Sequence, residues 1–162
     1  MAKSAETKTN VMRILDQKKI PYTPHSYEHD EGMAVDGISV AERLGENPEQ
    51  VFKTLVTKGA SGAYYVFDIP VAETLHLKNA AKSVREKSVE LVPVSEIQAL
   101  TGYIRGGCSP IGMKKQFRTV IDESAMDYET IIVSGGKIGT QVELSPQELV
   151  RLLRAETAAL TV

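Results

Sequence analysis

The apolar residues near the start of the chain recur at helical spacing, at Val11, Met12, Ile14 and Leu15. This spacing predicts an amphipathic helix over residues 9–19. Similar patterns predict further helices, at residues 35–44, 77–84, 95–102 and 145–153. Capping boxes that begin at Ser95 and Ser145 mark the starts of the last two helices. Gly45 and Gly102 are placed to end the helices that precede them.

Short β-rich runs with turn residues between them predict the strands, at residues 22–29, 51–57, 64–69, 89–92, 119–122, 130–133 and 141–144. Pro21 and Pro24 place the first strand at a sheet edge, because proline cannot donate to a ladder. The SGGK turn at residues 134–137 joins the last two strands as a hairpin. Since helices and strands are mixed without a regular βαβ rhythm, the pattern favours an α+β fold with a mixed or largely antiparallel sheet.

Composition places the chain among soluble globular proteins, since 42% of its 162 residues are hydrophobic and 25% are charged. The length suits a single domain over residues 1–162. The polar opening segment predicts no secretion signal, and no apolar run reaches the ~18 residues of a membrane span. One cysteine excludes an internal disulfide framework and a thiolate zinc finger. We therefore expect a cytoplasmic protein with no membrane contact.

The net charge of −2 gives no general sign of nucleic-acid binding, although a local basic patch can exist on a near-neutral protein. Basic residues gather in two stretches, at Lys78, Lys82, Arg85 and Lys87 and at Lys114, Lys115 and Arg118. Each stretch is either an ordinary solvated face or a surface for phosphate groups.

The segment YIRGGCSPIGMKK, residues 103–115, combines three glycines, a proline and the single cysteine. It does not match a phosphate-binding P-loop, because Met113 stands where that motif requires lysine. Cys108 is either an activated nucleophile or a small buried filler, which is the commoner role of a free cysteine. The glycines leave two further interpretations open, a plain surface turn or a ligand pocket lined by backbone.

Two more polar features lie in the predicted strands. His25 and His29 are four residues apart, but an HExxH pattern is absent and no third ligand is evident. We therefore predict a polar edge strand there and no metal site; His76 is predicted to be a surface residue. Lys53 interrupts the apolar run VFKTLV, so it either faces solvent on the open side of the sheet or lines a cleft as a fixed positive charge.

Taken together, several of these segments resemble the YbaK family, whose fold is shared with the editing insertion domain of bacterial prolyl-tRNA synthetase. The matching stretches occur in the family's order: YEHD at 27–30, VFKTL at 51–55, GGCSPIG at 106–112, SGGK at 134–137 and VELS at 142–145. The similarity covers nearly the whole chain. It implies a mixed, strongly curved β-sheet flanked by helices, and no cofactor.

Members of this family hydrolyse the ester of a tRNA that carries the wrong amino acid. The resemblance implies trans-editing of mischarged tRNA(Pro), above all Cys-tRNA(Pro), with prolyl-tRNA synthetase as a further candidate partner. Such editing is needed because a pocket for proline cannot strongly exclude residues of similar or smaller size. Alanine or another small residue is the alternative substrate. A non-catalytic module that docks tRNA or a synthetase is the rival interpretation.

The resemblance also implies roles for individual residues. The catalytic set is Lys53, Gly106, Gly107 and Ser134. The substrate-binding set is Tyr27, Asp36, Thr54, Pro110 and Gly135. From the two basic stretches rather than from the resemblance, the lysines expected to contact tRNA are Lys78, Lys82, Lys114 and Lys115. In this interpretation the glycine amides hold the ester carbonyl as an oxyanion hole does, and the cysteine of the glycine-rich segment is incidental.

The attacking group is expected to depend on the substrate, because no residue of the chain forms a convincing nucleophile–base pair. With cysteine the substrate's own thiol attacks the ester carbonyl, and with alanine a bound water attacks instead. One position departs from the family pattern, since Asp36 stands where many relatives carry an aromatic residue. We expect a more open pocket there or a carboxylate that meets the substrate's α-ammonium.

Overall fold

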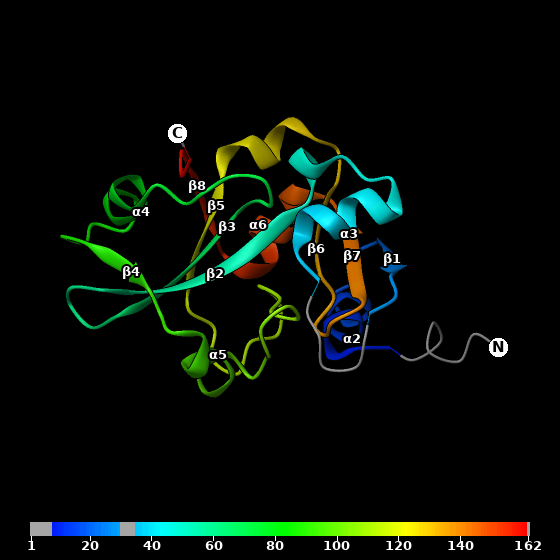
Figure 1. Cartoon of the computed structure of the whole chain (residues 1–162), viewed down its shortest axis with the longest axis horizontal. Helices are drawn as coiled ribbons and strands as arrows, with labels where there is room; N and C mark the ends of the chain where they lie inside the picture. Colours follow the sequence, from blue (N-terminus) through cyan, green and yellow to red (C-terminus); the bar gives the residue numbers. More distant parts are fainter. Residues whose placement is uncertain (1–7, 30–34, 162) are drawn as a thin grey trace.

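The computed structural model describes residues 8–29 and 35–161 (Figure 1). The α-helices are α2 (Asn10–Gln17), α3 (Gly37–Leu44), α4 (Leu77–Ser83), α5 (Val94–Thr101) and α6 (Pro146–Leu153). Short 3₁₀ helices are η1 (Pro48–Gln50) and η2 (Glu123–Asp127). Asp30 of the YEHD stretch lies outside the described residues.

The strands form two sheets. An antiparallel sheet has the order β1 (Tyr22–Ser26), β7 (Thr140–Leu144) and β6 (Ile131–Ser134). A mixed sheet has the order β4 (Val89–Leu91), β2 (Phe52–Gly59), β3 (Tyr64–Pro70), β5 (Arg118–Asp122) and β8 (Glu156–Ala158). In this second sheet β5 runs parallel to both β3 and β8, and the other pairs are antiparallel. The predicted α+β class with mixed strand directions is confirmed.

The two sheets meet where Val51, the residue before β2, bridges Ile132 of β6. The sequence predicts one sheet, whereas the strands form two sheets that meet at this bridge. In Figure 1 the three-stranded sheet lies to the right, and β4 and α4 lie at the opposite end of the molecule. The junction brings the first residues of β2 next to the end of β6, although about 80 residues separate them in the chain.

The predicted amphipathic helices α2 and α6 pack on the three-stranded sheet. Val11 and Leu15 of α2 and Leu149 of α6 are fully buried, in one cluster with Ile131 of β6 and Val142 of β7. A separate cluster beneath α4 contains Phe67 and Ile69 of β3. The apolar stripes read from the sequence are thus the faces that hold these helices in place.

Helix ends follow the sequence signals at most positions. The Ser145 hydroxyl accepts from the Glu148 amide at 3.3 Å, so the predicted start of α6 is confirmed. Gly45 and Gly102 end their helices in the left-handed conformation, as predicted. The capping box predicted at Ser95 is wrong. Pro93 occupies the N-cap position of α5 with φ fixed at −59°, so the helix begins before the serine.

The strand predictions hold in outline. β1 is an edge strand, and β6 and β7 form the predicted hairpin. The short strand β8 was not predicted, because its three residues, ETA, carry no apolar alternation. His76, predicted to be a surface residue, is partly buried and caps α4 by accepting from the Asn79 amide at 3.2 Å. No helix within residues 8–29 and 35–161 is long and apolar enough to cross a membrane.

Candidate active site

A small pocket lies at the junction of the two sheets. Its volume is about 160 Å³, below the ~300–1,000 Å³ of common small-molecule sites. Its lining includes five residues predicted from the sequence, Tyr27, Lys53, Thr54, Gly106 and Ser134. Valine side chains supply much of the apolar wall, at Val35, Val40, Val71 and Val133. A cavity of this size and lining suits a group no larger than an amino-acid side chain.

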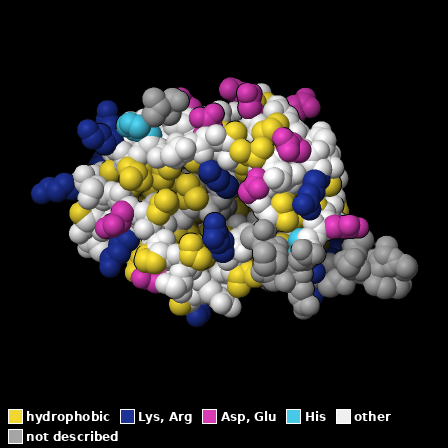
Figure 2. All heavy atoms as spheres, viewed as in Figure 1, with side chains coloured by type: hydrophobic (Ala, Val, Ile, Leu, Met, Phe, Trp, Pro, Cys, Tyr) yellow, Lys and Arg dark blue, Asp and Glu magenta, His cyan; other side chains and the backbone are white. Residues whose placement is uncertain are grey.

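Figure 2 shows a hollow near the centre of one face of the molecule, with Lys or Arg side chains and hydrophobic side chains at its edges. Lys53 lines the pocket from the start of β2, so the structure favours the cleft interpretation over a lysine that simply faces solvent. Burial lowers the pKa of the Lys53 ammonium, and the electrostatic attraction of the Glu73 carboxylate partly opposes this shift. Within the described residues the ammonium has no carboxylate in ion-pair range. It is therefore a half-buried charge with no carboxylate partner in the described part of the chain, which suits it to binding a ligand.

The glycine-rich segment reaches the pocket through Gly106. This residue has a φ of +88°, which a residue with a Cβ rarely adopts. The Gly106 amide has no hydrogen-bond partner within the described residues, whereas the Gly107 amide donates to the Ile104 carbonyl at 3.0 Å. Only the first of the two predicted glycine amides is therefore unoccupied.

Gly107 has a different role in the structure, since it packs against the SGGK turn. A Cβ on Gly107 would lie 2.9 Å from Lys137 Cα and 3.0 Å from the Ile138 amide nitrogen. The two predicted loops touch backbone to backbone at this point. The absence of a side chain at Gly107 thus sets how closely the two loops approach.

Ser134 lines the pocket from the end of β6. Its Oγ accepts a hydrogen bond from the Gly136 amide at 3.2 Å, so the hydroxyl proton remains available to donate to a ligand. The Gly135 amide donates to the Thr140 carbonyl at 2.8 Å and closes the turn. The SGGK turn therefore holds the serine hydroxyl toward the pocket by bonds within the turn itself.

Four predicted site residues do not line the pocket: Asp36, Gly107, Pro110 and Gly135. Asp36 is exposed and caps α3, accepting from the Ser39 amide at 2.8 Å and from the Ser39 hydroxyl at 2.8 Å. The bond from the Ser39 amide is the main reason that the pKa of the Asp36 carboxyl is lowered. The structure thus gives this aspartate a capping role, while its neighbours on either side, Val35 and Gly37, line the pocket. Pro110 is buried in the loop between α5 and β5.

Cys108 lines the pocket, but its environment opposes thiolate formation. Burial, with a smaller contribution from the Asp68 carboxyl, raises the pKa of the Cys108 thiol to about 12. A thiol in this state is a poor nucleophile at neutral pH. The structure therefore supports the interpretation of Cys108 as a partly buried filler.

Replacing Cys108 with alanine is accordingly expected to change kcat/KM for ester hydrolysis by less than about fivefold, since an inert thiol contributes only packing. A Cys108→Ser variant, which keeps a side chain of similar size, serves as the control. A loss of about 10⁴-fold or more in both variants, as is seen when enzymes lose a nucleophile, would contradict this expectation.

Sequence reasoning missed Gln141, which lies on β7 and lines the pocket. The residue is buried, and its Oε1 atom has no hydrogen-bond partner within the described residues. The Oε1 atom is itself closed off from solvent, so Gln141 forms part of the pocket wall without presenting this oxygen to the open pocket. No sequence signal distinguishes this glutamine from an ordinary polar residue of an alternating strand.

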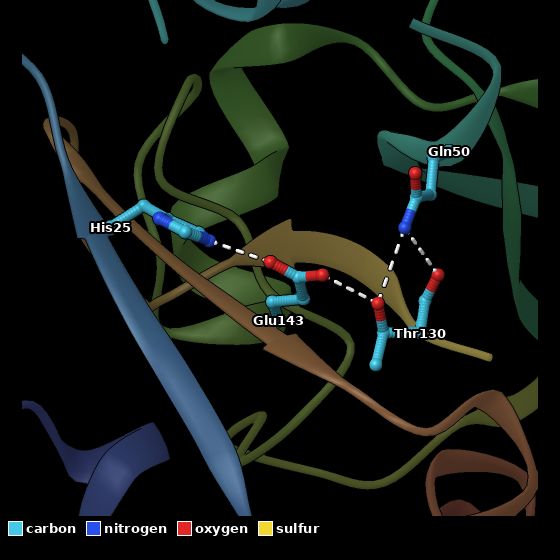
Figure 3. Close-up of polar contacts among 4 residues, drawn as sticks. All are labelled: His25, Gln50, Thr130 and Glu143. Atoms are coloured by element: carbon cyan, nitrogen blue, oxygen red, sulfur yellow. Dashed lines mark hydrogen bonds and ion pairs between the residues drawn. The ribbon is translucent and has the colours of Figure 1, made fainter. Parts of the chain in front are cut away.

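The predicted polar edge strand takes part in a network that ties β1 to β7 (Figure 3). His25 Nε2 lies 2.8 Å from Glu143 Oε1, and Thr130 Oγ1 donates to the other carboxylate oxygen. The Gln50 side-chain amide donates to the Thr130 carbonyl at 2.8 Å. The bond from Thr130 is the main reason that the pKa of the Glu143 carboxyl is lowered.

In the part of the chain that the structure describes, no three His, Cys, Asp or Glu side chains are grouped to hold a metal ion.

The predicted tRNA-contacting lysines fall in two places. Lys78 and Lys82 of α4 line a groove of about 800 Å³ together with Arg85 and Lys87. Lys114 and Lys115 are exposed in the loop before β5 and do not line this groove. The first basic stretch of the sequence thus forms one concave surface, and the second lies apart from it.

Comparison with known proteins identifies the family. Residues 34–152 match the model of the aminoacyl-tRNA editing domain. The chain is 45% identical over 159 residues to EbsC of Enterococcus faecalis, a candidate Cys-tRNA(Pro)/Cys-tRNA(Cys) deacylase, with 98% of this chain and 96% of the relative covered.

Two solved structures share the fold at lower identity. The crystal structure of a hypothetical protein has a TM-score of 0.84 and 22% identity, and covers 95% of this chain and 100% of its own. A candidate trans-editing enzyme for prolyl-tRNA synthetase has a TM-score of 0.78 and 22% identity, and covers 96% of this chain and 99% of its own. The resemblance noted in the sequence is confirmed, and the chain belongs to the aminoacyl-tRNA editing domain family.

Proposed function

We propose that this chain is a trans-editing deacylase that hydrolyses the ester of mischarged tRNA(Pro), with Cys-tRNA(Pro) as its main substrate. The observation that carries the proposal is the half-buried Lys53 ammonium, which has no ion-pair partner among the described residues. It lies in a pocket of amino-acid size, between the glycine-rich segment and the SGGK turn. The 45% identity to EbsC supports both the reaction and the cysteinyl substrate. The activity belongs in the cytoplasm, with aminoacylated tRNA as the substrate and prolyl-tRNA synthetase as a candidate partner.

In the proposed mechanism the protein positions and polarises the ester. Lys53 and the Gly106 amide stabilise the negative charge that develops on the carbonyl oxygen. The Ser134 hydroxyl donates to the substrate. Preorganised donors in a site shielded from water act more strongly than they would in bulk solvent. Tyr27 and Thr54 complete the wall around the amino acid.

The attacking group comes from outside the chain, since the Cys108 thiol is kept protonated. With a cysteinyl substrate, the substrate thiol loses its proton and forms a bond to its own ester carbonyl carbon. The bond from that carbon to the ribose oxygen breaks, and this oxygen takes up a proton. Water then opens the released thiolactone to give free cysteine. With alanine, water attacks the ester carbonyl directly, so the same pocket acts more slowly because attack is no longer intramolecular.

A panel of charged tRNAs tests this proposal. Release of the amino acid is followed over time for Cys-tRNA(Pro), Ala-tRNA(Pro), Pro-tRNA(Pro) and Cys-tRNA(Cys). Fastest release from Cys-tRNA(Pro) is expected, and equally fast release from Cys-tRNA(Cys) would mean that the tRNA body is not read. Preference for the alanyl ester would keep the reaction and change the substrate. Binding of tRNA with no release from any ester would favour the non-catalytic module.

We also propose that the groove beside α4 binds tRNA phosphates. Four cations, Lys78, Lys82, Arg85 and Lys87, line it, and the carboxylate of Glu86 is bound to Ser61 and Tyr65. A concave surface with this charge attracts a polyanion even on a protein of net charge −2. The pair Lys114 and Lys115 is the other predicted contact with tRNA.

Replacing Lys78 and Lys82 together with alanine is expected to raise the KM for the charged tRNA and leave kcat nearly unchanged. The slope of log Kd for tRNA against log salt concentration is expected to become shallower by about 2, since two phosphate contacts are lost. The double variant of Lys114 and Lys115 is the matched comparison. A slope unchanged by the first pair and reduced by the second would move the tRNA contact to the loop before β5.

A further inference from the structure

A carboxyl group lies buried directly behind the pocket. Asp68 of β3 has no exposed surface and interrupts an otherwise apolar strand, YYVFDIP. Burying a carboxyl group away from water costs free energy unless every oxygen is hydrogen-bonded. The packing of the sheet does not require an acidic residue at this position. The contacts of Asp68 with the pocket residues suggest a role for it there.

Asp68 faces two residues that line the pocket. It stands opposite Thr54 in the antiparallel register of β2 and β3, and Thr54 Oγ1 lies 2.5 Å from Asp68 Oδ1. From the glycine-rich segment the titratable group that acts on it is the Cys108 thiol. From β5 the register partner is the apolar Ile121. The other carboxyl oxygen, Oδ2, is buried with no partner within the described residues.

The protonation state of this carboxyl is sensitive to pH in the physiological range. Burial raises the pKa of Asp68 to about 7, and the hydrogen bond with Thr54 opposes the shift. When Asp68 is ionised it can only accept, so the Thr54 hydroxyl must donate to it and turns a lone pair toward the pocket. When Asp68 is protonated it donates to Thr54, and the threonine proton is free to enter the pocket.

We propose that Asp68 is a positioning residue that sets, through Thr54, whether the pocket offers an acceptor or a donor at this point. The inference rests on the proposed deacylase function. The ionised form is the productive one, because the Lys53 ammonium and the Gly106 amide already supply donors for the ester carbonyl. The α-ammonium of the substrate instead requires a hydrogen-bond acceptor. The Thr54 hydroxyl provides one when it donates its proton to the negatively charged Asp68 carboxylate.

The test measures kcat/KM for Cys-tRNA(Pro) from pH 6 to pH 8, with the spontaneous hydrolysis subtracted. The substrate's own groups titrate identically for every variant, so the informative quantity is the ratio of the parent rate to the Asp68→Asn rate. This ratio is expected to rise about tenfold over that interval, as a group of pKa near 7 ionises. The same comparison is made in a protein that already carries Thr54→Val. Because Asp68 is proposed to act through the Thr54 hydroxyl, the ratio of the Thr54→Val rate to the rate of the Thr54→Val, Asp68→Asn double variant is expected not to vary with pH.

A constant ratio across the pH range would show a merely structural role for Asp68, and a ratio that falls with pH would reverse the productive state; either overturns the proposal. If Asp68→Asn does not fold, the ratio of parent to Thr54→Val must rise with pH in the same way. Thr57→Val is the matched control, because that buried hydroxyl bonds to the Tyr65 carbonyl at 3.1 Å and does not line the pocket. A parent protein without deacylation would instead refute the proposed function.

Discussion

Replacing Lys53 with alanine is expected to lower kcat/KM for Cys-tRNA(Pro) by at least 100-fold. Removal of one preorganised donor to a developing oxyanion costs about 10²–10³ in rate in enzymes that have an oxyanion hole. Lys53 is also half-buried, which strengthens its interaction with a charged transition state. The loss is expected mainly in kcat, since binding of the tRNA body depends on other surfaces. Single-turnover and steady-state release of cysteine give both quantities.

The same variant is expected to fold at least as stably as the parent. Burial lowers the Lys53 pKa, so the folded state carries a penalty for the charged form that is present at neutral pH. Stability should therefore rise with pH only above the folded-state pKa, and removal of the charge at pH 7 should not reduce the melting temperature. Lys58→Ala is the control, because Lys58 is exposed on the same strand and stacks over the Tyr64 ring. Equal losses of kcat/KM in Lys53→Ala and Lys58→Ala would contradict a specific role for Lys53.

Gly107→Ala is expected to damage both stability and catalysis. The new Cβ would meet the backbone of Lys137 and Ile138 at 2.9–3.0 Å, and a backbone cannot turn aside as a flexible side chain does. Overpacking of this kind costs about 1–3 kcal/mol of unfolding free energy. Separating the two loops would also displace Ser134 and Gly106 from each other across the pocket, and we expect kcat/KM to fall at least about tenfold, since small misplacements of catalytic groups are costly.

Denaturant unfolding and the deacylation rate check this prediction together. Gly62→Ala is the matched control, because Gly62 lies in the β2–β3 turn with φ +96° and no atom within 4 Å of an added Cβ. Only the backbone conformation opposes that change, at about 1–2 kcal/mol, and deacylation should be unaffected. Unchanged activity in Gly107→Ala would show that the close contact of the two loops is not required for catalysis.

Local patterns predicted the elements of this fold well, because short-range physics determines them. The apolar period of α2 and the capping serine of α6 are examples, and both are present in the structure. The α5 start was misplaced because Pro93 and Ser95 both carry start signals, and the backbone restriction of proline prevailed. The division into two sheets depends on the pairing of Val51 with Ile132, and such a distant contact leaves no local pattern.

The candidate site shows the same limit. From the pattern alone Lys53 fitted either solvent or a cleft, and only the junction of the sheets places it in a pocket. The glycine-rich segment indicated a close backbone approach, which occurs at Gly107, but the hydrogen bond from its amide to Ile104 was not readable from the sequence. Asp68 did carry a signal, an acid inside an apolar strand. Its link to Thr54 became visible only when β2 and β3 were aligned in register.

The most direct test is the rate of cysteine release from Cys-tRNA(Pro) with enzyme in excess, for the parent protein and for Lys53→Ala. We expect the parent to release cysteine far faster than the spontaneous rate, and the variant to retain no more than about one hundredth of that acceleration. Release by the parent at the spontaneous rate, or equal release by both proteins, would contradict the assignment of the Lys53 pocket as a deacylase site.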